Sequence, residues 1–198
     1  MHHARPLLLI PLLLACVACS QTDNDAAADT VVPPDPVAEP APVIDQPTKA
    51  ASATLAATEG NQVSGLLMFS VVDGVVHATG EVRGLAADSE HGFHLHEHGD
   101  CSAPDATSAG GHFNPATSDH GRVGHGDHHG GDSDNLKADA NGVAVVDARF
   151  EGVTLGDGAA TDIDGKGVIV HADADDYTTQ PTGNAGARLA CGVIQAAQ

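Results

Sequence analysis

Apolar and polar residues alternate along several short segments of this 198-residue chain. In residues 75–83, the apolar Val76, Ala78 and Val82 lie at even-numbered positions, and most residues between them are polar. Residues 144–150 repeat the pattern. Because successive side chains of a β-strand point to opposite faces, this period of two predicts strands with one buried and one exposed face.

Turn signals separate these segments. Asp73 and Gly74 stand between two apolar runs, which predicts a β-hairpin with a type I′ turn. The segments GVIVHAD (167–173) and RLACGVI (188–194) predict two short buried strands. With 23 glycines and few helix-favouring runs, the chain is predicted to form one all-β domain over residues 53–198.

The segment HGFHLHEHGDC places histidines at every second position. On a strand, Phe93 and Leu95 would pack into the core, and the opposite face would carry His94, His96 and His98. Imidazoles at neighbouring positions of one face can form half of a metal site. A polar strand face that happens to be rich in histidine is the alternative interpretation.

A long segment between about Asp100 and Lys137 shows almost no apolar periodicity. A loop of that length inside a domain needs a reason, and metal ligation is a sufficient one. An all-nitrogen site suited to copper could form from His94, His96, His112 and His171. A site of three nitrogens and one oxygen, suited to zinc, could form from His112, His120, His129 and Asp132. His112 belongs to both sets and could bridge two metals through its two ring nitrogens.

The formal net charge of −19 argues against nucleic acid and anionic lipid as partners. It does not exclude an anionic substrate, provided that a local positive charge overrides the general field.

The first 18 residues are interpreted as an export signal. Arg5 precedes an apolar run over residues 7–14, and small residues follow before a cysteine. The apolar run is too short to span a bilayer as a permanent helix.

A cysteine that follows alanine and precedes polar sequence resembles a bacterial lipoprotein cleavage site. We assign lipidation to Cys19, with Cys16 as the alternative. Residues 19–52 are rich in Pro, Ala and Asp, and we interpret them as a semi-extended tether. Membrane contact is therefore expected only through an N-terminal lipid.

Several motifs resemble the copper,zinc superoxide dismutase family. They are HGFHLHEHGD, GGHFNP, TGNAGARLACGVI and the spacing of His120, His129 and Asp132. The resemblance covers about residues 53–198. It implies a Greek-key β-sandwich or barrel of about eight antiparallel strands, with long metal-binding and active-site loops.

The resemblance also assigns the site residues. It implies copper bound by His94, His96, His112 and His171, and zinc bound by His112, His120, His129 and Asp132, with His112 as the bridge. It implies that Arg188 is the active-site arginine and that Asp175 links a copper histidine to a zinc histidine. The implied disulfide joins Cys101 and Cys191, which are also the only pair of cysteines in the folded part after signal removal.

The implied activity is dismutation of superoxide to dioxygen and hydrogen peroxide, with one copper and one zinc in each subunit. The export signal places this activity in the periplasm or at the cell surface, as a defence against superoxide. A periplasmic metal buffer without turnover is the rival interpretation. Arg188 and Asp175 speak against it, because storage needs neither an anion anchor nor a link between sites.

Three features depart from the family pattern or remain open. The loop segment YTTQPT (177–182) lacks the charged residues that eukaryotic members carry there. Both a monomer and a homodimer are compatible with the sequence. The surplus histidines are interpreted as solvated loop residues or as accessory metal-capture sites: His91, His98, His125 and His128.

Overall fold

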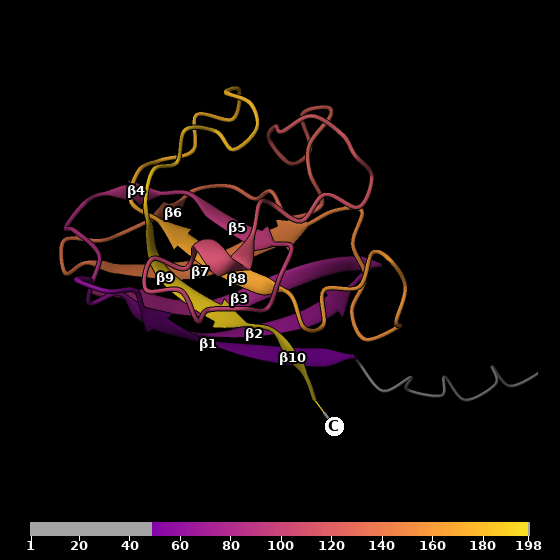
Figure 1. Ribbon diagram of the computed structural model, residues 1–198, viewed down its shortest axis with the longest axis horizontal. Helices are drawn as coiled ribbons and strands as arrows, with labels where there is room; N and C mark the ends of the chain where they lie inside the picture. The colour runs from indigo at the N-terminus through magenta and orange to yellow at the C-terminus, as the bar shows by residue number, and fades with distance from the viewer. Residues whose placement is uncertain (1–48, 198) are drawn as a thin grey trace, which may run out of the picture. The chain divides into compact units, whose positions relative to one another are not determined.

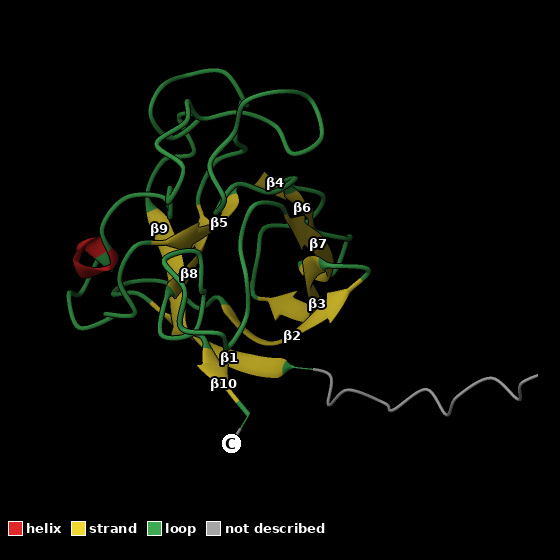
Figure 2. Ribbon diagram, turned by 90° about the vertical axis from the view of Figure 1, so that its right-hand side faces the viewer, coloured by secondary structure: helices red, strands yellow, loops and turns green. Residues whose placement is uncertain are grey.

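A computed structural model describes residues 49–197 of the chain (Figures 1 and 2). In chain order its elements are β1 (Ala50–Ala57), β2 (Ser64–Val72), β3 (Val75–Arg83), β4 (Glu90–His91), β5 (Phe93–His96), the short 3-10 helix η1 (Thr107–Ala109), β6 (Leu136–Lys137), β7 (Val143–Phe150), β8 (Gly167–His171), β9 (Arg188–Val193) and β10 (Gln195–Ala196). This confirms the all-β prediction.

The export signal (1–18), both candidate lipidation cysteines, Cys16 and Cys19, and the tether as far as residue 48 lie outside the described residues. Strand β1 begins at Ala50, three residues before the predicted start of the folded domain. Within residues 49–197, no helix is long and apolar enough to cross a membrane.

Most strands belong to one curled antiparallel sheet of eight strands. Its order is β5-β8-β9-β1-β2-β3-β7, and β10 pairs with β1 beside this path. Residues 50–55 of β1 pair with β2, whereas Ala56 and Ala57 pair with β9. Strand β1 therefore connects the two halves of the sheet, which face each other in Figure 2. The separate strands β4 and β6 form a two-stranded sheet.

The β2–β3 hairpin has the predicted turn. Asp73 has a φ of 51° and Gly74 a φ of 83°, as a type I′ turn requires at its two central residues. The register pairs Val72 with Val75 across the turn. This register places the alternate apolar residues of both strands on the same inner face.

The core fills the space between the two halves of the sheet. It includes the buried side chains predicted from the alternating pattern of β7, because Ala144, Val146, Ala148 and Phe150 are all inaccessible to solvent or nearly so. The largest fully buried apolar side chains include Phe69, Phe93, Phe150, Leu55, Leu67 and Leu95. Burial of such side chains is the main stabilising contribution to the sheet.

Two long loops lie on the same side of the sheet in both views (Figures 1 and 2). The first covers residues 97–135 and contains η1 as its one regular element in the described structure. The second covers residues 172–187 and connects β8 to β9. The predicted loop between about Asp100 and Lys137 is thus present, although its last two residues form β6.

Candidate metal centre

The predicted ligand histidines come from strands and loops that meet at one place. His94 and His96 lie on β5, and His171 is the last residue of β8, which pairs with β5. His112 lies in the first long loop and forms a β-bridge with His96. This pairing positions the loop histidine beside the strand histidines.

Two groups of side chains result, and in each one the potential ligand atoms lie within 4.8 Å of one another. The four-histidine group consists of His94, His96, His112 and His171. The three-histidine group consists of His112, His120, His129 and Asp132. All seven residues are buried, and His112 belongs to both groups.

Hydrogen bonds define which ring nitrogen each strand histidine can offer. His96 Nδ1 donates to the carbonyl of Gly110 (3.0 Å), so that its Nε2 is left for the group. His171 Nδ1 donates to the carbonyl of Gly186 (3.4 Å), and its Nε2 lies 3.3 Å from Nε2 of His96. A hydrogen bond at one ring nitrogen fixes the orientation and tautomer of the other.

Asp175 connects the two groups. Its Oδ2 accepts a hydrogen bond from His94 Nε2 (2.7 Å), and its Oδ1 accepts one from His120 Nε2 (3.0 Å). Because Nε2 of each histidine is bound to Asp175, Nδ1 of His94 faces the four-histidine group and Nδ1 of His120 faces the three-histidine group. The structure therefore places Asp175 between a histidine of each group.

His112 belongs to both groups, and its two ring nitrogens differ in their contacts. Its Nδ1 donates to Asp132 Oδ1 (2.8 Å), whereas its Nε2 has no hydrogen-bond partner. The other Asp132 oxygen, Oδ2, accepts from the main-chain N–H groups of Gly121 (3.1 Å) and His129 (2.8 Å). These contacts hold the carboxylate in place.

Within residues 49–197, four buried ring nitrogens make no well-formed hydrogen bond: His94 Nδ1, His112 Nε2, His120 Nδ1 and His129 Nδ1. The last two lie near the Asp132 carboxylate, with His120 Nδ1 3.0 Å from Oδ2 and His129 Nδ1 3.4 Å from Oδ1. An unsatisfied buried polar atom is costly, so these atoms mark positions where a ligand is needed. Four imidazoles suit copper, and three imidazoles with one carboxylate suit zinc. The residues present therefore fit both metals.

Burial and nearby carboxylates shift the pKa values of these histidines in opposite directions. Burial lowers the pKa of His96 and His171 well below the usual value and that of His112 to about 4. For His120, burial opposes the charged form, but the carboxylates of Asp132 and Asp175 raise the pKa to about 9. Neutral imidazole is the form that ligates a metal.

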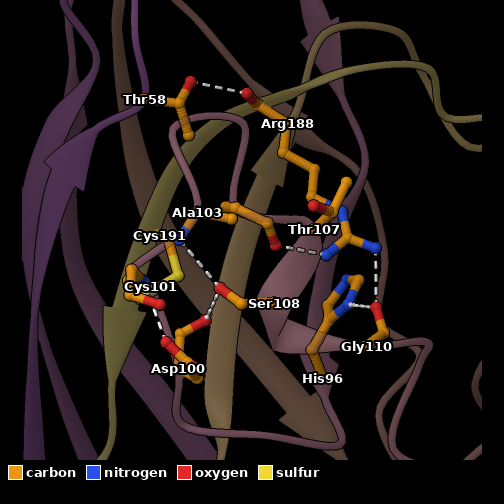
Figure 3. Close-up of a disulfide and its surroundings, with 12 residues drawn as sticks. Thr58, His96, Asp100, Cys101, Ala103, Thr107, Ser108, Gly110, Arg188 and Cys191 are labelled. Carbon is orange, nitrogen blue, oxygen red and sulfur yellow. Dashed lines mark hydrogen bonds between the residues drawn. A yellow bond between two sulfur atoms is a disulfide. The ribbon is translucent and has the colours of Figure 1, made fainter.

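Arg188, the first residue of β9, extends toward His96 of the four-histidine group (Figure 3). Its guanidinium donates to the carbonyls of Ala106 (2.5 Å) and Gly110 (2.6 Å). The carbonyl of Gly110 also accepts the hydrogen bond from His96, so one oxygen joins the arginine to a candidate ligand. A cavity of about 330 Å³ opens at Arg188 and is also lined by Asp105 and Thr107.

The predicted disulfide is present between Cys101 and Cys191, with a Cα–Cα distance of 5.8 Å (Figure 3). It attaches the start of the first long loop to β9, three residues after Arg188. Inside this loop, Ser108 Oγ donates to the carbonyl of Asp100 (2.8 Å) and accepts from the Ala103 N–H (3.1 Å). The segment that holds the guanidinium is thus tied to the strand that carries it.

Gly183 in the second long loop has a φ of 64° and lies against the Asp175–His120 pair. A Cβ at this position would be 1.7 Å from Asp175 Oδ1 and 2.7 Å from His120 Nε2. No side chain fits there without displacing the carboxylate.

Two expectations about the surplus histidines are wrong. His98 does not share the face of His94 and His96, because β5 ends at His96 and the chain then turns to hydrogen-bond with residues 109–111. His98 is exposed as a result. His91 is not a solvated loop residue, because it is 4% exposed and donates through Nδ1 to the carbonyl of His171 (2.8 Å).

The remaining two surplus histidines stay outside both groups. His125 is exposed. His128 is half-buried, and its Nδ1 donates to the carbonyl of His129 (2.7 Å).

Sequence reasoning missed His91 and Gln180, which contact the candidate ligands His171 and His120, and Asn135, which contacts Asp175. On a continuous strand, His91 would lie on the opposite face from His94 and His96, which is a weak sign of a different role. For Asn135 and Gln180 the sequence carries no signal, because their contacts depend on which loops meet.

Known proteins resemble this chain in sequence and fold. The family described as "Copper/zinc superoxide dismutase (SODC)" matches residues 63–194. Cu-Zn superoxide dismutase 2 of Aquifex aeolicus is 36% identical over 148 residues, which cover 73% of this chain and 86% of that protein. Cu-Zn superoxide dismutase of Caulobacter vibrioides is 39% identical over 150 residues, which cover 73% of this chain and 85% of that protein. The solved structure of the clock protein EA4 is similar, with a TM-score of 0.67 and 38% identity, and the match covers 76% of this chain and 96% of that one. The chain therefore belongs to the copper/zinc superoxide dismutase family.

Proposed function

We propose that this protein is a superoxide dismutase that converts two superoxide ions and two protons into dioxygen and hydrogen peroxide. The observation that carries the proposal is the four-histidine group beside Arg188, with His112 shared by a second group. Copper held by the first group would supply one-electron redox chemistry, and zinc held by the second would supply structural order without redox chemistry.

His112 is the proposed bridge between the two metals. Its Nε2 has no hydrogen-bond partner, and its Nδ1 donates to Asp132. When Nε2 is free of other bonds, it can carry a proton to the peroxide product. Burial disfavours the charged form of His112 and lowers its pKa to about 4, so at neutral pH the ring is neutral, which is the form that ligates a metal.

Arg188 is the proposed anchor for the superoxide anion. Hydrogen bonds to two carbonyls fix its guanidinium, and Arg188 lines the cavity. A fixed cation at this place stabilises an anion without reorganisation and overrides the negative net charge locally.

The experiment is a superoxide-consumption assay combined with metal analysis of wild type and two variants. We expect cyanide-sensitive turnover in wild type. Arg188→Ala should retain both metals while turnover falls by roughly tenfold or more, because the arginine acts on the anion. His112→Ala should lose metal from both groups. Bound metal without any turnover in wild type would establish the metal buffer instead, and unchanged turnover in Arg188→Ala at low ionic strength would remove this residue from the site.

We infer further that the protein is exported and held to a membrane by a lipid on Cys19 or, alternatively, Cys16. The support is the short apolar run over residues 7–14, the small residue before each cysteine and the proline-rich segment that follows. Cys19→Ser, or Cys16→Ser if cleavage falls there, should release the protein into the soluble periplasmic fraction. A wild-type protein that is wholly soluble and carries no lipid would contradict the anchor.

A further inference from the structure

The main chains of His120 and Asp175 are each bound by a side-chain amide from the opposite loop. His120 lies in the first long loop and Asp175 in the second, and these loops lie side by side in Figures 1 and 2. Among the described residues, neither the N–H nor the carbonyl of His120 or Asp175 bonds to another main-chain group. Their backbone positions therefore depend on side chains.

The first amide is that of Gln180. Its Oε1 accepts from the His120 N–H (2.9 Å), and its Nε2 donates to the His120 carbonyl (2.9 Å). This two-point pairing resembles one rung of a β-ladder, in which a side chain takes the place of the partner strand. It fixes both the position and the rotation of the His120 backbone.

The second amide repeats this arrangement in the reverse direction. Asn135, at the end of the first loop, accepts from the Asp175 N–H through Oδ1 (2.8 Å) and donates through Nδ2 to the Asp175 carbonyl (2.9 Å). The two bound residues contact each other directly, because His120 Nε2 lies 3.0 Å from Asp175 Oδ1. Each loop thus holds the other at the residue pair that joins the two ligand groups.

We propose that Gln180 and Asn135 are positioning residues that form a reciprocal amide clamp, which preorganises the three-histidine group for its metal. The inference depends on the proposed function at one point only, which is the identity of the bound metal as zinc. With the clamp closed, His120 Nδ1 points into the group before the metal arrives. Loss of one amide allows the two loops to separate, so that bound zinc is released faster.

The test measures zinc release to a chromophoric chelator and the dissociation constant of cobalt as the probe metal. Gln180→Leu removes both hydrogen bonds at nearly constant size, and Gln180→Glu retains only the acceptor. Gln180 is exposed, so neither change disturbs the core. The matched control is Gln62→Leu, another exposed glutamine, for which no side-chain hydrogen bond is seen within residues 49–197. Asn135→Leu tests the second amide.

We expect Gln180→Leu and Asn135→Leu to release zinc about tenfold faster than wild type and to bind cobalt about tenfold more weakly. Gln180→Glu should be intermediate, and Gln62→Leu should equal wild type. A clamp that serves only the fold would lower the melting temperature with unchanged cobalt affinity, and this result would overturn the proposal, as would equal release rates in all variants. Neither readout requires turnover. If the variants differ from wild type as expected but wild type consumes no superoxide, the proposed function is refuted and the clamp is retained.

Discussion

Asp105 shares the cavity at Arg188 and carries the opposite charge. Its carboxylate accepts hydrogen bonds from the Thr107 N–H (3.0 Å) and the Thr107 hydroxyl (2.8 Å), which lower its pKa and keep it ionised. An anion that enters this cavity therefore meets a fixed cation and a fixed anion. At the scale of single residues, this balance of charge decides how strongly the cavity attracts an anion.

Asp105→Asn should raise the rate of superoxide consumption at low ionic strength. The carboxylate is exposed, so its effect on an approaching anion is weakened by water, and roughly a twofold increase is expected. Added salt should reduce the difference, because it screens the charge. The control is Asp147→Asn, which removes an exposed carboxylate on β7. Equal gains in the two variants would show that only the net charge matters.

His129 and His128 are adjacent, but only His129 belongs to a ligand group. His129 is buried with an unsatisfied Nδ1, whereas His128 uses its Nδ1 to bind the carbonyl of His129. In the cobalt-substituted protein, His129→Ala should change the visible absorption spectrum strongly, and His128→Ala should change it little. The reverse result would mean that the ligand assignment is displaced by one residue.

Zinc affinity should depend on pH through His120. In the metal-free protein the pKa of His120 is raised to about 9, so the ring is protonated at neutral pH and zinc must displace a proton. The apparent affinity should therefore rise as pH increases toward 9 and level off above it. Calorimetric titration in two buffers of different ionisation enthalpy counts the released protons. A pH-independent affinity between pH 7 and 9 would contradict the raised pKa.

At the scale of elements, the disulfide and the loop that it closes determine where the guanidinium lies. The loop carbonyls of Ala106 and Gly110 bind Arg188, and the bond from Cys101 to Cys191 attaches this loop to β9. Loop and strand therefore act as one unit.

Replacement of both cysteines by serine should lower the free energy of unfolding and the turnover together. In the chain-entropy description, opening a loop of 90 residues costs about 4–5 kcal/mol. Turnover should fall because the carbonyls that hold Arg188 become mobile, while the buried ligands on β5 and β8 retain metal. Chemical denaturation and metal analysis measure the two effects. Unchanged turnover at full metal content would show that the loop holds the arginine without the disulfide.

The sequence predicts the strands well and the contacts between loops poorly. Alternation along β3 and β7 reports burial directly, because each side chain faces either the core or solvent. His94 and His96 follow from the same period. The role of Gln180 does not follow, because an exposed polar residue looks the same whether it faces water or another loop. The position of His98 could not be predicted either, because the end of β5 depends on hydrogen bonds with residues far along the chain.

At the scale of the whole molecule, the sheet and the metal centre depend on each other. The strands β5 and β8 contribute both core residues, such as Phe93 and Val170, and candidate ligands. Within residues 49–197, four buried ring nitrogens without a well-formed hydrogen bond destabilise the metal-free fold. Metal binding should therefore stabilise the domain as a unit.

Removal of both metals with a chelator should lower the melting temperature of the protein. A ligand at a thousandfold excess over its dissociation constant stabilises the native state by about 4 kcal/mol, so the shift should grow with metal concentration. Differential scanning calorimetry before and after reloading measures it. Identical melting temperatures with and without metal would mean that the unfolded chain binds metal equally well.

The absent side chain of Gly183 limits how this loop can evolve. Thr178 and Thr179 nearby have exposed side chains that bond only to Asp176, so mutations there can accumulate in descendants of this chain at little cost. At position 183 the volume of a single methyl group is already occupied by the carboxylate of Asp175. Thr178 and Thr179 can therefore be replaced in descendants of this chain. Every lineage that retains the Asp175–His120 contact must also retain glycine at position 183.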